Sequence, residues 1–385
     1  LIPVGDGCRA GGFLLSARGP HWSPRMRLTA VLTLLALAAC ERAPKVQPAA
    51  PASPALEARE VAAADAYGEA GETVGAVAFW SHPSINFESL LIAATDKGLK
   101  AYKIETGETV ASAGETPVSD LEVFYDGVGA AASAYAVALA SGQYEFYAIA
   151  NDSPALTMLD ATNAHAGASA FCAGRGALYE AGNGRLAARD ITISENSVSL
   201  GAAREIAGVE NIAACAVDDR SGDIVAVSSD GGMRRVDPET GEVFGIAFAA
   251  GGKADASSLF LMTTPEPDNA QGGVVAVLDG EAGAISLYDL VDGHALGTVR
   301  VKPTFDLDAV ASAKTIAAGY GNYGGVYRDG ALAVVTAGDG APIRLVPWNG
   351  VLSALQLPLG ENVDPRDPAP VAEEESVIDI EFIEP

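Results

Sequence analysis

A repeat of strand-like segments, which begins near residue 74 and continues almost to the C-terminus, constrains the fold more than any other feature of the sequence. Each unit contains an apolar segment, a turn, a segment of small and β-branched residues, a glycine turn and a third strand-like segment. Six units follow one another at a period of roughly 45 to 50 residues, the length of a four-stranded blade. Their segments cover 76–80, 90–95 and 99–104; 121–125, 135–140 and 145–149; 168–172, 177–179 and 186–191; 212–217, 224–227 and 233–236; 259–263, 274–278 and 285–290; and 308–311, 331–336 and 343–346.

The repeat predicts an all-β fold, a six-bladed β-propeller of four-stranded antiparallel blades that spans residues 74–367. One unit alone is a small sheet with two apolar faces, so stacking the units radially is what covers both faces. Closing the ring also removes long free strand edges. We find no amphipathic helical pattern between the strands, which argues against a parallel βαβ fold. The 43 glycines and the 49% of hydrophobic residues agree with many short strands around a large core.

The N-terminal region carries the features of an export signal. Met26-Arg27 precedes an apolar run, residues 28–39, that is too short to cross a bilayer as a permanent helix. The run ends in Leu37-Ala38-Ala39-Cys40, which resembles a bacterial lipobox; an ordinary signal peptide with a chance cysteine is the alternative. We predict a leader and lipoprotein signal peptide over 1–40 with lipidation of Cys40. Since Glu41 rather than an aspartate follows, we expect an outer-membrane lipoprotein that is periplasmic or surface-exposed.

The two segments that flank the predicted propeller differ from it in composition. Residues 41–73 are rich in Pro and Ala and lack apolar periodicity near Cys40, which predicts a disordered tether. Residues 368–385 form an acidic tail, in which the apolar alternation over 377–383 is compatible with a last strand that pairs with the first blade and closes the ring.

Inside the predicted propeller only Cys172 and Cys215 remain of the 4 cysteines. An oxidising compartment permits them to form a disulfide, and two buried free thiols are the alternative.

The net charge of −26 excludes nucleic acid as an expected partner, because no basic stripe is present to release counterions from a phosphate backbone. A cation or a basic protein surface fits the charge better. The alternative is that acidity only keeps an exported protein soluble.

Several phrases of the sequence resemble the β-propeller phytases. Ala76 to Pro83, followed by Thr95-Asp96-Lys97-Gly98-Leu99, is similar to the opening blade of that family. Cys215 to Asp219, Leu345 to Trp348 and Val363 to Arg366 are similar to later phrases in the same order, so the resemblance covers about residues 74–367. It implies hydrolysis of phosphate from phytate with calcium ions held by carboxylates in the central channel.

The resemblance also implies site residues. Lys97 matches a phosphate-binding lysine, and Asp306 and Asp308 match an acidic phrase that holds calcium and takes part in catalysis. Because Asp306 and Asp308 alternate with Phe305 and Leu307, both acids would face one side of a strand, where they would hold calcium if that side is the channel.

Other family positions are replaced in this sequence. Phe124 stands where the family has a phosphate-binding arginine. Small residues stand at the positions of several family ligands: Ala166-Gly167, Ala213-Ala214, Ser228-Ser229 and Ala256-Ser257-Ser258. A calcium ion usually takes six to eight oxygen ligands. Repositioned acids such as Glu122, Asp255 or Asp279 would be needed to rebuild such a site.

Two hypotheses about function follow. One is a calcium-assisted hydrolase of the 3-phytase type, which acts on phytate or a related phosphate ester through Lys97, Asp306 and Asp308. The other is a non-catalytic propeller lipoprotein that binds a ligand or an envelope protein. The four histidines, His21, His82, His165 and His294, are isolated and give no zinc or triad spacing. The carboxylates of 218–223 favour a hairpin turn over an EF-hand.

Overall fold

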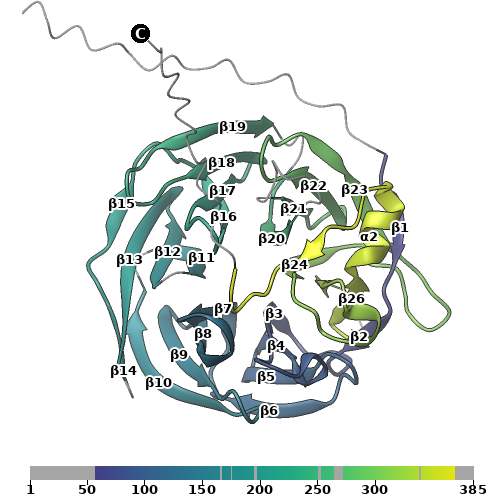
Figure 1. The fold of residues 1–385 in the computed structure, drawn as a ribbon, viewed down its shortest axis with the longest axis horizontal. Coiled ribbons are helices and arrows are strands. Elements are labelled where there is room, and N and C mark those ends of the chain that lie inside the picture. Colours follow the sequence, from purple (N-terminus) through teal and green to yellow (C-terminus); the bar gives the residue numbers. More distant parts are fainter. Residues whose placement is uncertain are drawn as a thin grey trace, which may run out of the picture. The chain divides into compact units, whose positions relative to one another are not determined.

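A computed structural model describes residues 57–368 apart from 165–166, 175, 195–196, 250–252, 264–271 and 338–339. These residues belong to one compact unit, Ala49–Pro385. Their strands form six sheets arranged in a ring around a central axis (Figure 1). The predicted six-bladed β-propeller is confirmed.

In each blade the inner strands are antiparallel and follow one another along the chain from the axis outward. Blades 1 and 2 consist of β3 (Val74–Trp80), β4 (Leu90–Thr95), β5 (Gly98–Lys103) and β6 (Thr109–Ala113), and of β7 (Val118–Asp126), β8 (Ser133–Ala140), β9 (Gln143–Ile149) and β10 (Leu156–Asn163). Blades 3 and 4 consist of β11 (Ala168–Gly174), β12 (Ala177–Gly182), β13 (Arg185–Ser194), β14 (Ser197–Leu200) and β15 (Arg204–Ile206), and of β16 (Ile212–Val217), β17 (Ile224–Ser228), β18 (Gly232–Val236) and β19 (Val243–Ala249).

Blades 5 and 6 include strands from the two ends of the described chain. Blade 5 consists of β20 (Ala256–Thr263), β21 (Gly273–Asp279), β22 (Ala284–Asp289) and β23 (Ala295–Lys302), with β1 (Arg59–Ala62) parallel to β23 and β27 (Glu361–Asn362) beside β20. Blade 6 consists of β24 (Ala313–Gly319), β25 (Ala331–Thr336), β26 (Ile343–Pro347) and β2 (Asp65–Tyr67).

The N-terminal strands close the ring. After β26 the chain enters the helix α2 (Trp348–Leu355) instead of a fourth strand, so β2 fills the outer edge of blade 6. The predicted tether, residues 41–73, is therefore wrong over 59–67, where Val61 is 3% and Tyr67 5% exposed. The two strands are too short for apolar alternation to reveal them. The C-terminal segment over which we predicted a closing strand lies outside the described residues.

The first strand of blade 6 begins later than the sequence pattern predicted. Residues 308–311 lie in the loop between β23 and β24, and the strand is Ala313–Gly319. The alternation around Asp308 resembles a strand, but the residues that pair with β25 are the small ones that follow it, from Ala313↔Thr336 to Gly319↔Ala331.

The hydrophobic core lies between neighbouring sheets. All six residues of β4 and all six of β25 are buried, because these strands are covered on both faces. The indole of Trp348 in α2 stacks on Phe260 of blade 5, with ring centroids 3.9 Å apart. The helix thus covers the junction between blades 5 and 6.

A disulfide joins Cys172 of β11 to Cys215 of β16, with their Cα atoms 5.6 Å apart. The structure thereby decides between the two alternatives that the sequence left open. The bond links the innermost strands of blades 3 and 4 close to the axis.

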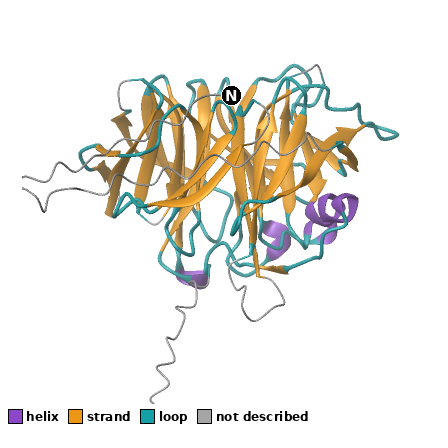
Figure 2. Cartoon of the chain, turned by 90° about the horizontal axis from the view of Figure 1, so that it is seen from above, coloured by secondary structure: helices purple, strands orange, loops and turns teal. Residues whose placement is uncertain are grey.

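The C-terminal part of the described chain crosses one end of the ring. Residues 361–367, here called the strap, begin at β27 beside β20 and cross the centre to the loops of blades 1 and 2 (yellow in Figure 1). There the buried Arg366 guanidinium donates to the backbone oxygens of Ser81, at 3.0 Å, and Ala132. The helices lie at the same side of the ring (Figure 2), which we call the strap face.

Candidate functional site

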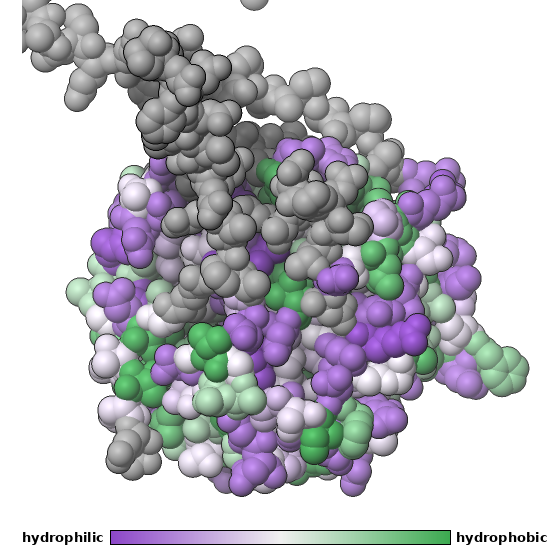
Figure 3. All heavy atoms as spheres, in the orientation of Figure 1, coloured by the Kyte–Doolittle hydropathy of each residue, from purple (hydrophilic) through white to green (hydrophobic). Residues whose placement is uncertain are grey.

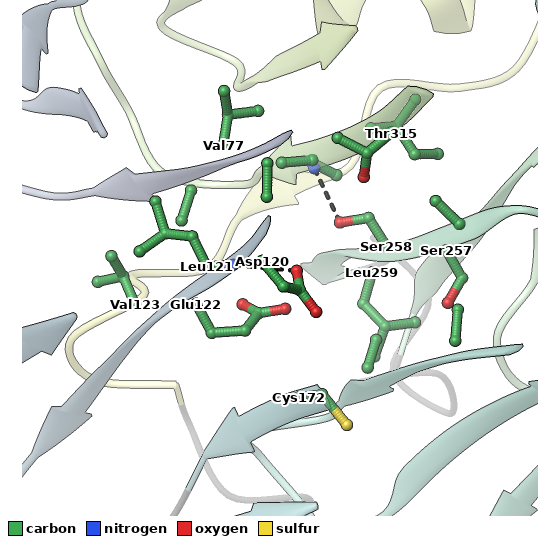
Figure 4. A pocket seen from close by; sticks show the side chains of 18 of the residues that line it. Val77, Asp120, Leu121, Glu122, Val123, Cys172, Ser257, Ser258, Leu259 and Thr315 are labelled. Carbon is green, nitrogen blue, oxygen red and sulfur yellow. Dashed lines mark hydrogen bonds between the residues drawn. The ribbon is translucent and has the colours of Figure 1, made fainter. Parts of the chain in front are cut away.

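A cavity of about 270 Å³ lies on the axis of the propeller. The six innermost strands β3, β7, β11, β16, β20 and β24 form its wall (Figure 4). Pro365 of the strap lines it as well, so the strap closes the end at the strap face. At the opposite end Ser119, Asp255 and Lys314 line the cavity and are exposed. The cavity is therefore a blind pocket that opens on the face away from the strap.

Small residues on the innermost strands leave the space open. Residues 75–78 and 213–216 contribute only Gly, Ala, Val and Cys to the wall. Five of the six innermost strands also carry a register shift near their start, for example between Val118 and Asp120. Such a shift is a β-bulge, in which two residues oppose one residue of the partner strand, and it changes the direction of the side chains at that point.

Carboxyl groups dominate the ionisable side chains of the wall. Asp120, Glu122, Asp219 and Asp255 line the cavity together with a single amine, that of Lys314. Asp120 and Glu122 are two residues apart on β7, so both side chains lie on the axial side of the strand. Figure 4 shows their carboxyl groups next to each other in the cavity.

Asp120 links two blades as well as lining the cavity. Its carboxylate accepts hydrogen bonds from the backbone N–H of Leu121, at 2.9 Å, and of Phe171 on β11, at 3.1 Å. Burial raises the pKa of Asp120 to about 6, and the two N–H donors oppose that rise. The residue therefore has a structural role that is independent of any ligand.

Glu122 differs from Asp120 because its carboxyl group makes no hydrogen bond or ion pair within the part of the chain that the structure describes. Burial raises its pKa well above the ordinary value, and the negative charges of Asp120 and Asp219 raise it further. A charged Glu122 therefore has no cationic partner among the described residues, although Lys314 lines the open end of the same pocket.

Phenol groups lie towards the strap end of the cavity. The hydroxyl of Tyr320 donates to Asp219, at 3.3 Å, and burial raises the pKa of this tyrosine far above its ordinary value. The hydroxyl of Tyr125 accepts from the backbone N–H of Ser81, and the Arg366 guanidinium lies 5.0 Å from the centre of its ring. The wall at this end combines aromatic faces with one carboxylate.

The structure does not bring the predicted site residues together in the cavity. Lys97 lies exposed in the turn between β4 and β5, where its backbone N–H donates to Thr95. Asp306 and Asp308 are exposed in the loop before β24, so the interpretation that they alternate on a strand is wrong. None of the three is among the residues that line the cavity. Burial lowers the pKa of Arg344, and the negative charge of Asp308 opposes that lowering.

Of the acids considered as replacements, Glu122 and Asp255 line the cavity and Asp279 does not. Asp279 accepts from the backbone N–H of Ala282 in a turn. Asp120 and Asp219 also line the cavity, and neither was predicted as a site residue. Asp120 is two residues from Glu122 and shares its side of the strand, which was the available signal. Asp219 follows β16 in a turn and ends the phrase Cys215 to Asp219 that resembles the phytases, which was its signal.

The calcium ions implied by the family resemblance do not fit the donors of this cavity. Within the described ranges, one group of three acidic, histidine or cysteine ligands has its atoms within 4.8 Å of one another: Asp289, Asp292 and His294. That group lies in the turn between β22 and β23, where Asp289 accepts backbone N–H groups. The cavity carboxyls form no such group, and calcium needs six to eight oxygens.

No family model matches the chain, and no curated protein is significantly similar to it in sequence. No helix in the described ranges has the length and apolar character needed to cross a membrane. Solved structures that resemble the chain include Hsv2 from Kluyveromyces lactis, with 12% identity over 69% of this chain and 72% of that chain and a TM-score of 0.36. Hsv2 from Kluyveromyces marxianus has 12% identity over 69% of this chain and 70% of that chain, with a TM-score of 0.38.

Proposed function

We propose that this protein is a non-catalytic binding propeller whose central cavity holds a small organic cation. The observation that carries the proposal is the Glu122 carboxyl group, which lies beside two further acids in a blind pocket without a partner among the described residues. Burying a carboxylate in this way is costly unless a positive charge is supplied. A bound ammonium group supplies it.

The composition of the wall favours an organic cation over a phosphate ester. Phosphates are bound by arginine and lysine side chains. The cavity wall has four carboxyl groups, of which Asp255 is paired with Lys253 at 3.1 Å, and the single amine of Lys314. The ring of Tyr320 is part of the wall, and aromatic rings attract ammonium groups. The volume of about 270 Å³ suits a small molecule.

The competing proposal is calcium-assisted hydrolysis of phytate or a related phosphate ester. The sequence phrase that contains Lys97 and the phrase that contains Asp306 and Asp308 favour it. The position of these three residues outside the cavity wall disfavours it, because a hydrolytic site needs them to converge on one phosphate.

We also propose that the protein is an envelope lipoprotein anchored through Cys40. The disulfide between Cys172 and Cys215 supports an oxidising compartment. Metabolic labelling with a radioactive fatty acid tests this proposal: the label is expected in the wild-type chain and not in Cys40→Ser. Equal labelling of both chains contradicts lipidation at this residue.

Calorimetric titration of the purified chain with putrescine, choline, succinate and phytate tests the binding function. We expect one of the two cations to bind, the two anions not to bind, and Glu122→Gln to weaken cation binding roughly tenfold or more. The matched control is Glu115→Gln, which changes an exposed acid outside the cavity wall. Binding of phytate, or phosphate release from it in the presence of calcium, would overturn the proposal in favour of the hydrolase.

A further inference from the structure

The strap face carries exposed apolar side chains that the cavity does not explain. Four of them project from loops that join the first and second strands of blades 1, 2 and 6: Ile85, Phe87, Val128 and Val326, with 39%, 53%, 67% and 55% of their surface exposed. We call these four residues the apolar patch. Large apolar side chains at this exposure are individually ordinary, but a group of them on one face marks an interaction site.

The loops that bear the patch lie side by side. Gly324, two residues before Val326, lies so close to the blade 1 loop that a side-chain Cβ atom there would be 3.4 Å from the Cβ atom of Phe87. On the other side of this loop, Arg366 joins it to the blade 2 loop, because its guanidinium donates both to Ser81 and to Ala132. The apolar patch therefore lies beside the strap and extends over the adjacent blades 6, 1 and 2.

Hydrogen bonds hold the same loops in place. His82 Nδ1 accepts the backbone N–H groups of Ser84 and Ile85, at 3.2 and 2.9 Å. The backbone N–H of Gly129 donates to the oxygen of Arg366 at 2.9 Å. A preformed surface of this kind loses little conformational entropy when a partner binds.

Acidic side chains surround the patch. Asp126, Asp364 and Asp367 are exposed beside it. The nearby Glu88 is paired with Lys103 at 2.8 Å, and Asp329 lies 3.5 Å from Arg328, so these two pairs contribute no net charge. Figure 3 shows this face, with hydrophobic groups separated by hydrophilic ones. The rim of the patch is therefore negative.

We propose that the apolar patch docks a protein partner through a segment in which apolar side chains alternate with lysine or arginine. The negative rim selects such a segment by charge complementarity, while Phe87 and Val326 supply the apolar contact. A second copy of this chain would present the same negative rim and be repelled. The rim disfavours an anionic lipid surface for the same reason.

Binding of model peptides to the purified chain tests the docking surface. We expect a synthetic leucine–lysine peptide to bind and a leucine–glutamate peptide of equal length not to bind. Phe87→Ser and Val326→Ser should each weaken binding of the lysine peptide roughly tenfold. Met158→Ser is the matched control, because Met158 is 50% exposed on β10 and outside the patch.

A double variant, Asp126→Asn with Asp367→Asn, tests the role of charge. It should weaken binding of the lysine peptide and make that binding less dependent on salt. Asp96→Asn, in the turn between β4 and β5, is the control and should have neither effect. Equal binding of both peptides, or no effect of Phe87→Ser, would overturn the proposal. So would binding of neutral phosphatidylcholine vesicles that is lost in Phe87→Ser, which would assign the patch to a membrane. Glu122→Gln should leave peptide binding unchanged, so failure of the cavity proposal does not affect this result.

Discussion

Among the single residues, Asp120 and Glu122 are both carboxylic acids, two positions apart on β7, and they have different roles. The Asp120 carboxylate receives two backbone N–H donors and so connects blade 2 to blade 3. Glu122 receives no such donor within the described ranges and lies beside two other acids. A half-buried carboxylate without a partner lowers stability, and functional sites often keep such destabilising groups.

Glu122→Gln should stabilise the protein at high pH and not at low pH. The folded state raises the pKa of Glu122, so it holds the proton more tightly than the unfolded chain. The stability that protonated Glu122 contributes is therefore lost as pH rises above the ordinary value of 4.5 and through the folded pKa. Removing the carboxyl group should raise the free energy of unfolding by about 1 kcal/mol at pH 8.

Urea unfolding at pH 4 and pH 8 measures this effect. At pH 4 the variant and the wild-type chain should unfold at nearly the same urea concentration, because the carboxyl group is mostly protonated in both states. The control Glu115→Gln should show no difference at either pH. A stability gain that is equal at both pH values would show that the charge of Glu122 is not its cause.

At the scale of secondary-structure elements, the sequence predicts the long buried strands and misses the short outer ones. β4 and β25 are almost continuous runs of apolar residues, which identify them without a structure. β2 has only three residues and pairs along β26 with a partner far away in the sequence, so no local pattern reveals it. The acids before β24 alternate like a strand but lie in a loop, which is why the predicted site failed there.

Removing β1 and β2 should destabilise the ring. A chain that begins at residue 69 leaves the outer edge of β26 unpaired and exposes the surfaces that Val61 and Tyr67 cover. The loss should be about 4 kcal/mol or more, from the buried area of these two side chains and the lost strand pairing. Thermal unfolding followed by circular dichroism compares this chain with one that begins at residue 57; equal midpoints would contradict closure by β2.

The disulfide should contribute to stability by restraining the unfolded chain. It closes a loop across a sequence separation of 43 residues, for which chain entropy gives about 3 to 4 kcal/mol. Cys172→Ala combined with Cys215→Ala should lower the free energy of urea unfolding by this amount in the absence of reductant. Adding reductant to the unfolding wild-type chain should produce the same loss, and a double variant as stable as the oxidised wild-type chain would refute the estimate.

At the scale of the whole molecule, the ring separates two kinds of surface. The end of the axis that opens to solvent leads to the acidic cavity, and the strap closes the other end, where the apolar patch lies. The radial repeat predicts the ring, but it does not predict which inner-strand residues face the axis together, because that depends on the register shifts near the strand starts. Glu122 and Asp255 were therefore only two of several candidate acids.

In the proposed complex, an organic cation replaces the proton of Glu122 in the cavity. Calorimetric titration of the chain with putrescine or choline, repeated in buffers of different ionisation enthalpy, measures the protons released on binding. At a pH where Glu122 is protonated, we expect the wild-type chain to release protons when the cation binds and Glu122→Gln to release none. The control Glu115→Gln should behave like the wild type. Cation binding without proton release, or equal release by Glu122→Gln, would contradict this proposal.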